Sequence, residues 1–186
     1  ASNLALDENI KLTRQVVKVA HAKGVWVQGE VGAIMGSPGD ITSRLKKIPL
    51  ADPDEVAKFV KETKVDTIAV AVGTAHGVHA NEDIVFSLLK AIKKQVKIPL
   101  VLHGGSGVQD AKIKKAIKEG INIINVSTDL KVAFCQELIR NCLNNKKETD
   151  PRNLLAPTIV AVEKVVLEKM KLFGSAGKAA LSKVET

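Results

Sequence analysis

The sequence predicts an α/β fold with a parallel sheet, on the strength of two patterns. Short β-branched apolar runs alternate along the chain with longer segments in which apolar residues follow helical spacing. The runs are nearly continuous rather than alternating, which is typical of strands covered on both faces. With 186 residues, of which 45% are hydrophobic and 26% charged, the chain is expected to form a single domain over residues 1–186.

A helix, a strand and a long loop are predicted in the N-terminal part of the chain. The helix begins near Asp7 and Glu8 and ends before Gly24, a residue suited to a helix C-terminus. A strand over residues 25–31 follows and carries Glu30 near its end. Residues 32–49 have no clear period and are rich in glycine and proline, which is typical of a lid loop. The apolar positions of the helix are Ile10, Val16, Val17 and Ala20.

The rest of the chain repeats helix and strand. Asp52-Pro53-Asp54-Glu55 supplies an N-cap, a proline at the first helical position and a glutamate at the third, so a helix is expected to start here. The inward-facing residues are expected to include Val56, Phe59, Val60, Leu88, Leu89 and Ile92. Further helices are expected near residues 83–96, 110–119, 129–143 and 154–173, and strands at 65–72, 99–103 and 121–126.

The chemically distinctive polar residues follow predicted strands. A (β/α)8 TIM barrel places its site at this C-terminal end of its strands. Four strands are predicted where a barrel has eight, so the chain is expected to supply about the last four strands and their helices, with the N-terminal strands missing. Alone, such a part of a barrel would leave two sheet edges open.

Charge, aromatic content and cysteine usage exclude several classes of protein. The formal net charge is +8, but aromatic residues make up 3% and tyrosine is absent, so nucleic-acid binding by base stacking is not expected. No apolar run approaches the roughly 20 residues of a membrane span. Cys135 and Cys142 lie about 10 Å apart on one predicted helix. We expect two buried, reduced thiols and a cytoplasmic location.

Two histidines each close an apolar run and open a glycine-rich loop. They are His76 in Gly73-Thr74-Ala75-His76-Gly77 and His103 in Leu102-His103-Gly104-Gly105-Ser106-Gly107. An imidazole followed by backbone without bulky side chains suits a metal ion beside a phosphorylated ligand. A single histidine at a strand end is more often structural, and a short glycine-rich segment is more often a turn. The occurrence of both patterns twice favours a site.

Five segments carry a resemblance to a known family: Gln28–Gly32, Gly73–Gly77, Leu102–Gly107, Asn125–Thr128 and Asp150–Arg152. Their order and intervals resemble the C-terminal two-thirds of class II, zinc-dependent ketose-bisphosphate aldolases, nearest to the fructose-bisphosphate and tagatose-bisphosphate branch. The resemblance implies a lyase of carbohydrate metabolism, including glycolysis. Such a lyase would cleave fructose or tagatose 1,6-bisphosphate to dihydroxyacetone phosphate and glyceraldehyde 3-phosphate, or catalyse the reverse condensation.

The resemblance also implies a role for each matched residue. His76 and His103 are expected to bind zinc, with Glu30 at a further position open to the ion or its waters; a monovalent cation is an additional candidate cofactor. Asn125 is expected to stabilise the enediolate. Arg152 is expected to reach the distal phosphate of the substrate across a dimer interface, which implies a homodimer or homotetramer. The expected substrate-binding residues are Gly77, Gly104, Gly105, Ser106, Asn125, Val126, Ser127, Thr128 and Arg152.

Several alternatives stay open. Taken alone, Asn125 would more often satisfy a loop backbone, and Arg152 could equally be a solvated surface residue. The family's Asp-His segment, which supplies the acid/base and a zinc ligand, does not occur in this sequence, so the isolated chain is expected to be a weak or inactive enzyme. Asp40 is the nearest carboxylate to the family's lid glutamate. The alternative function is a truncated, non-catalytic remnant that binds sugar phosphate or assembles with a partner chain.

Overall fold

The structure is a computed structural model that describes residues 2–32, 50–74 and 83–179. The chain divides into two compact units, Ala1–Thr128 and Asp129–Thr186. Each unit is described by itself below. The expected single domain over residues 1–186 stays a prediction.

The first unit holds a parallel sheet whose strands follow the order of the chain. The strands are β1 (Gln28–Val31), β2 (Thr67–Val70), β3 (Leu100–Leu102) and β4 (Ile121–Ile124). They are neighbours in the order β1-β2-β3-β4, and every pair is parallel. The helices of this unit are α1 (Leu6–His21), α2 (Pro53–Thr63), α3 (Phe86–Gln95) and α4 (Asp110–Lys118).

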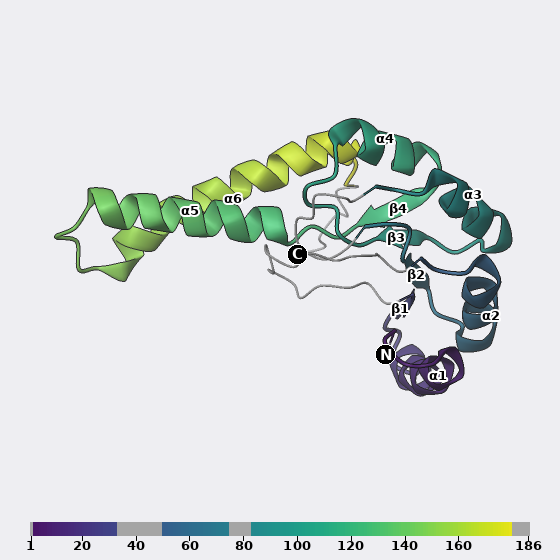
Figure 1. Ribbon diagram of the computed structural model, residues 1–186. Helices are drawn as coiled ribbons and strands as arrows, with labels where there is room; N and C mark the ends of the chain where they lie inside the picture. The colour runs from purple at the N-terminus through teal and green to yellow at the C-terminus, as the bar shows by residue number, and fades with distance from the viewer. Residues whose placement is uncertain (1, 33–49, 75–82, 180–186) are drawn as a thin grey trace. The chain divides into compact units, whose positions relative to one another are not determined.

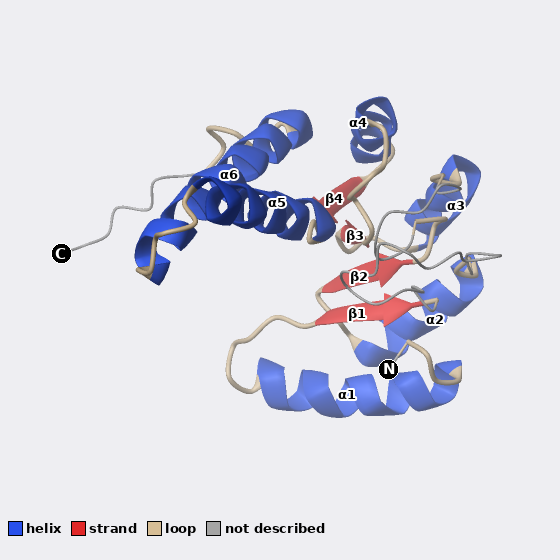
Figure 2. Cartoon of the chain, turned by 60° about the vertical axis from the view of Figure 1, so that its left-hand side comes forward, coloured by secondary structure: helices blue, strands red, loops and turns tan. Residues whose placement is uncertain are grey.

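These helices all lie on one side of the sheet. Figure 1 shows α1 to α4 in an arc outside the strands, and Figure 2 shows the strands side by side in chain order. Parallel strands joined by right-handed crossovers place each connecting helix on the same face when the strand order never reverses. This is the winding of a (β/α) barrel, and it differs from a doubly wound sheet, whose order reverses at a switch point.

The core of the first unit lies between this helix layer and the central strands. β2 and β3 are buried at every position, as the near-continuous apolar runs predict. The largest fully buried side chains include Phe59, Ile68, Leu89, Ile92, Leu100, Leu102 and Ile113. β1 and β4, the first and last of the described strands, are less buried, since Gln28 of β1 and Asn122 of β4 are exposed. The sheet is therefore best protected in its middle strands.

The predicted start of α2 is confirmed. The Asp52 carboxylate accepts hydrogen bonds from the backbone N–H groups of Asp54 at 2.9 Å and Glu55 at 3.1 Å, and Pro53 occupies the first turn. These bonds satisfy amides that have no partner inside the helix. The helix ends at Lys64, which adopts a left-handed conformation with φ of 62°.

Some expected details are wrong. The first strand begins at Gln28, not at residue 25, because β2 starts only at Thr67 and Val25 and Trp26 extend past it with 55% and 76% of their surface exposed. Val16 is also exposed, whereas Ile10 and Val17 are buried against the rest of the unit. Apolar spacing therefore identified the helix but not every residue of its buried face.

The second unit contains two long helices, α5 (Thr128–Asn144) and α6 (Pro151–Phe173), the first beginning one residue before the unit does. α6 starts three residues earlier than expected because Asp150 caps it: its carboxylate accepts from the Arg152 N–H at 2.9 Å, and Pro151 follows the cap. None of the helices in the described ranges is long and apolar enough to cross a membrane.

The expectation of two buried cysteines is wrong, because Cys135 and Cys142 are both exposed. Their spacing places them on one face of α5. The side of α5 that faces α6 is different and includes Ala133, Glu137 and Arg140. The thiols therefore lie on a side of the helix that α6 does not cover.

Candidate functional site

Polar side chains from three segments meet at the C-terminal edge of the sheet. Glu30 lies near the end of β1, His103 directly follows β3, and Asn125 directly follows β4. Parallel strands bring their carboxyl ends to one edge, so residues distant in sequence become neighbours there. The structure thus brings together three of the residues that the sequence singled out.

The Nε2 atom of His103 is the centre of this cluster. It lies 3.7 Å from Oε2 of Glu30 and 3.5 Å from Nδ2 of Asn125. Nε2 of Gln28 is nearer still, at 3.2 Å. An amide nitrogen only donates hydrogen bonds, so either contact is a hydrogen bond in the tautomer that leaves this ring nitrogen unprotonated. The His103 side chain is 14% exposed and the Glu30 side chain 26% exposed, so both groups are accessible to a small ligand.

Neighbouring residues hold the two central side chains in place. The buried Thr74 hydroxyl donates a hydrogen bond to the backbone carbonyl of His103 at 2.6 Å. Ser2 Oγ donates to Oε1 of Glu30. Asn9, buried in α1, donates from Nδ2 to the Glu30 carbonyl at 3.0 Å. Each contact joins segments far apart in the chain, which fixes the strand ends relative to one another.

The loop after His103 approaches the end of β4 closely. Gly104, Gly105 and Ser106 are all buried. Gly104 has a φ of 68°, and a Cβ atom at Gly105 would lie 2.7 Å from Cγ2 of Ile124. A residue larger than glycine at position 105 would force the Ile124 side chain to shift. The loop therefore presents its backbone, rather than side chains, at the edge where His103 lies.

The remaining predicted binding residues fall into three groups. Ser127 is exposed, Val126 is half-buried and Thr128 is buried at the start of α5. Arg152 belongs to the second unit and lies against Asp150, with its Nη2 atom 2.6 Å from Oδ2; this hydrogen bond raises the pKa of Arg152 and lowers that of Asp150. His76, Gly77 and Asp40 lie outside the described residues.

The donor atoms near His103 are of types that bind divalent metal ions, but the described residues include too few of them for a complete site. Imidazole nitrogen and carboxylate oxygen are both ordinary zinc ligands. Within residues 2–32, 50–74 and 83–179, no three His, Cys, Asp or Glu side chains are grouped closely enough to hold a metal ion. Glu30 and His103 therefore amount to two candidate ligands among the described residues.

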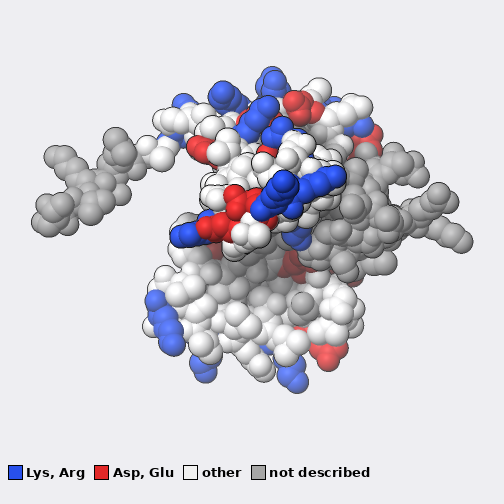
Figure 3. All heavy atoms as spheres, turned by 90° about the vertical axis from the view of Figure 1, so that its left-hand side faces the viewer, with Lys and Arg blue, Asp and Glu red and all other residues white. Residues whose placement is uncertain are grey.

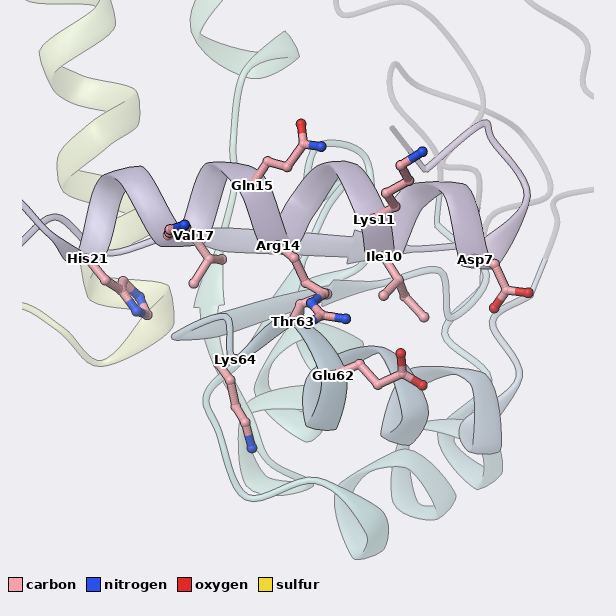
Figure 4. Close-up of a pocket in the computed structure, with 11 residues that line it drawn as sticks. Asp7, Ile10, Lys11, Arg14, Gln15, Val17, His21, Glu62, Thr63 and Lys64 are labelled. Atoms are coloured by element: carbon pink, nitrogen blue, oxygen red, sulfur yellow. The ribbon is translucent and has the colours of Figure 1, made fainter.

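An open groove of about 890 Å³ lies between α1 and α2, apart from this cluster. Figure 4 shows Ile10, Arg14 and Val17 pointing from α1 toward α2, whereas Gln15 points away. Neither His103 nor Glu30 lines the groove. On the face seen in Figure 3, basic side chains are scattered and interspersed with acidic ones. Neither feature marks a second site.

Comparison with known proteins decides the family. The family model described as fructose-bisphosphate aldolase class-II matches residues 1–178. The chain belongs to the class II fructose-bisphosphate aldolase family. The predicted resemblance is thereby confirmed, and the sheet described above is part of the family's (β/α)8 barrel.

Similar proteins in this aldolase family come from several organisms. The chain is 37% identical to a fructose-bisphosphate aldolase of Helicobacter pylori strain J99, covering 96% of this chain and 66% of that protein. It is 41% identical to a 6-phospho-5-dehydro-2-deoxy-D-gluconate aldolase of Bacillus subtilis, covering 98% and 62%.

Solved structures of aldolases also match the fold of this chain. The YdjI aldolase of Escherichia coli K12 has a TM-score of 0.77 at 37% identity, covering 97% of this chain and 60% of that one. The fructose-bisphosphate aldolase of Campylobacter jejuni has a TM-score of 0.74 at 25% identity, covering 93% and 58%. The chain thus spans about 58–66% of the length of these family members.

Sequence reasoning missed Gln28 as a member of this cluster around His103. Its amide nitrogen is closer to His103 Nε2 than the Asn125 amide nitrogen or the Glu30 carboxylate. Strand alternation could have revealed it, because residues two apart in a strand point to the same face and Glu30 follows Gln28 by two.

Proposed function

We propose that this chain provides the metal-binding and phosphate-binding part of an aldolase that acts on a ketose 1,6-bisphosphate, fructose or tagatose. The products would be dihydroxyacetone phosphate and glyceraldehyde 3-phosphate. The observation that carries the proposal is the convergence of Glu30, Gln28 and Asn125 on the ring nitrogen of His103, at the carboxyl edge of a parallel sheet. Membership of the class II aldolase family supports it.

The residues proposed to hold zinc are His103, Glu30 and His76. The first two have suitable donor atoms and lie close enough to share one ion, with Nε2 and Oε2 3.7 Å apart. When bound, zinc would supply a Lewis acid for the substrate carbonyl. The hydrogen bond from Thr74 fixes the backbone of His103, and Ser2 fixes the Glu30 carboxylate, so both ligands are oriented before any ion arrives.

The chain's other residues would bind and stabilise the substrate. Backbone N–H groups of Gly104 and Gly105 and the Ser106 hydroxyl can donate to a phosphate dianion without steric hindrance. The Asn125 amide, 3.5 Å from His103 Nε2, can donate to an oxygen that becomes negative during bond cleavage. Ser127 and Thr128 add hydroxyl donors after β4, and Arg152 would bind the distal phosphate. We keep Asp40 as a candidate for proton transfer.

The test is metal-dependent aldol cleavage by the protein as expressed from its own gene, alongside the 186-residue chain. Substrates are fructose and tagatose 1,6-bisphosphates and, because a 41% identical relative carries that name, 6-phospho-5-dehydro-2-deoxy-D-gluconate. We expect cleavage of a bisphosphate that a chelator abolishes and zinc restores. Zinc binding without cleavage of any substrate would instead support the non-catalytic remnant.

We also propose that the protein acts as a homodimer or homotetramer in the cytoplasm. The proposed role of Arg152 supports this assembly, because the residue lies 88% exposed in the second unit, where a partner could meet it. Light scattering of the purified protein measures the oligomeric state, and a monomer at assay concentration would contradict the proposal.

A further inference from the structure

Gln28 stands at the start of β1 with its side chain on the same face of the strand as Glu30. Its amide nitrogen lies 3.2 Å from Nε2 of His103, a contact that spans 75 residues of sequence. The Gln28 side chain therefore links the start of β1 to the residue that follows β3.

The distances around His103 match those between two ligands of one ion. In a tetrahedral zinc site with bonds of about 2.0–2.1 Å, two donor atoms are about 3.3 Å apart. The Gln28 amide lies 3.2 Å from His103 Nε2, and the Glu30 carboxylate lies 3.7 Å from it. Each of these two side-chain ends thus lies near the distance from His103 Nε2 that separates two ligands of one zinc ion.

We propose that Gln28 is a further metal-binding residue, which supplies its amide oxygen. Without a cation, the NH2 end of the amide donates to the lone pair of His103 Nε2. Rotation about the last side-chain bond, which has no steep barrier between its two orientations, exchanges NH2 for oxygen at nearly the same place. The same side chain then holds the imidazole in position before metal binding and donates to the metal afterwards.

This inference rests on the proposed metal site at His103 and Glu30. It adds a neutral oxygen donor, so the described ligands would carry one negative charge, that of Glu30. Oxygen donors suit harder divalent ions better than soft ones. Gln28 is accordingly expected to widen the range of ions accepted by the site, with manganese and cobalt binding as well as zinc.

The experiment titrates zinc into the metal-free protein by calorimetry, without substrate. The variants are Gln28→Leu, which removes the donor, Gln28→Asn, which shortens its reach, and Gln28→Glu, which keeps an oxygen donor. Gln15→Leu, an exposed glutamine on α1, is the matched control. We expect a loss of zinc affinity of about tenfold or more for the first two, the size typical of altered metal surroundings. Gln28→Glu and the control should keep wild-type affinity or better.

A second readout separates coordination from folding. Cobalt(II) bound to the wild type and to Gln28→Leu should give different visible absorption spectra, while thermal melts of the metal-free proteins should coincide. Equal zinc affinity for Gln28→Leu, Gln28→Asn and wild type, together with loss of binding in His103→Ala, would overturn the role of Gln28 and leave the proposed function intact. A wild type that binds no zinc would overturn both.

Discussion

The hydroxyl of Thr74 donates a 2.6 Å hydrogen bond to the backbone carbonyl of His103, and this bond joins the segment after β2 to the residue that follows β3. Thr74 is buried, so its hydroxyl has no water to replace this partner. The bond holds the backbone of His103, and we expect it to help fix the direction of the ring.

Thr74→Val is expected to lower the free energy of unfolding by about 1 kcal/mol, because it removes one buried hydrogen bond and keeps the shape. It should also weaken zinc binding, since His103 loses its anchor. The control is Thr63→Val, a buried threonine whose hydroxyl donates to the Phe59 carbonyl within α2. Urea unfolding and calorimetry measure the two effects; an equal loss of zinc affinity in both variants would contradict the anchoring role.

Gly73→Ala is expected to destabilise the protein by more than about 2 kcal/mol, because strain and steric overlap add. Gly73 has a φ of 110°, and an added Cβ would lie 2.1 Å from the backbone carbonyl oxygen of Asp83. Gly24→Ala is the comparison: φ is 68° and nothing lies within 4 Å of the added atom. That variant should cost only about 1 kcal/mol of conformational strain. Similar losses of unfolding free energy in the two variants would show that the structure around Gly73 accommodates the added Cβ atom at little cost.

The stability of the first unit should fall in acid through Asp66. Its carboxylate accepts from the Val27 N–H at 2.7 Å and lies 2.9 Å from His21 Nε2, and these two contacts lower the pKa of Asp66 from its usual 3.8. A lowered pKa stabilises the fold fully above pH 3.8, and this contribution disappears as the pH falls through the folded value. Urea unfolding of wild type and Asp66→Asn should differ most near neutral pH and converge below pH 3.8.

Asp52→Ala should cost about 1 kcal/mol of folding free energy, since two amides at the start of α2 lose their acceptor. Asp110→Ala is the control, because Asp110 is in the first turn of α4 but does not cap it. Denaturant midpoints measure the difference. If Asp110→Ala loses as much folding free energy as Asp52→Ala, the effect comes from the negative charge near the helix start and not from the capping hydrogen bonds.

Arg152→Ala should raise the KM for a ketose bisphosphate about tenfold to a hundredfold, as expected for a lost charge-assisted hydrogen bond to phosphate. A substrate with a single phosphate should be much less affected. Arg140→Ala serves as control, since this guanidinium is exposed in the same unit and paired with Glu137. Steady-state kinetics on both substrates distinguish a phosphate contact from a general effect of surface charge.

Local chemistry made part of the fold predictable from sequence. Asp52-Pro53 determines the start of α2 by hydrogen bonds that the residues make with their own neighbours. Asp150-Pro151 does the same for α6, whose start lies three residues before the first apolar position of the expected helix, Leu154. Exposure of Cys135 and Cys142 depends on which side of α5 meets α6, which residue spacing along α5 does not specify.

The sequence predicts which residues of the candidate site lie at the carboxyl ends of the parallel strands, and therefore at one edge of the sheet. Glu30, His103 and Asn125 could be placed at one edge because parallel strands share an orientation. The contact of Gln28 with His103 depends on register across β2 and on a side-chain conformation, neither of which the residue pattern specifies. His76, the other expected imidazole, lies outside the described residues and stays a prediction.

The contact between Gln28 and His103 also has a kinetic consequence. Gln28 lies on β1 and His103 directly follows β3, with only β2 between these strands, and the two residues are 75 positions apart in the chain. Because closing so long a loop costs more entropy than closing the shorter crossovers, we expect this pair to form late in folding. Metal uptake during refolding would therefore report the docking of β1 rather than the collapse of the core. Separation of β1 from β2 is therefore expected to abolish metal binding at His103 while β2 and β3 stay paired.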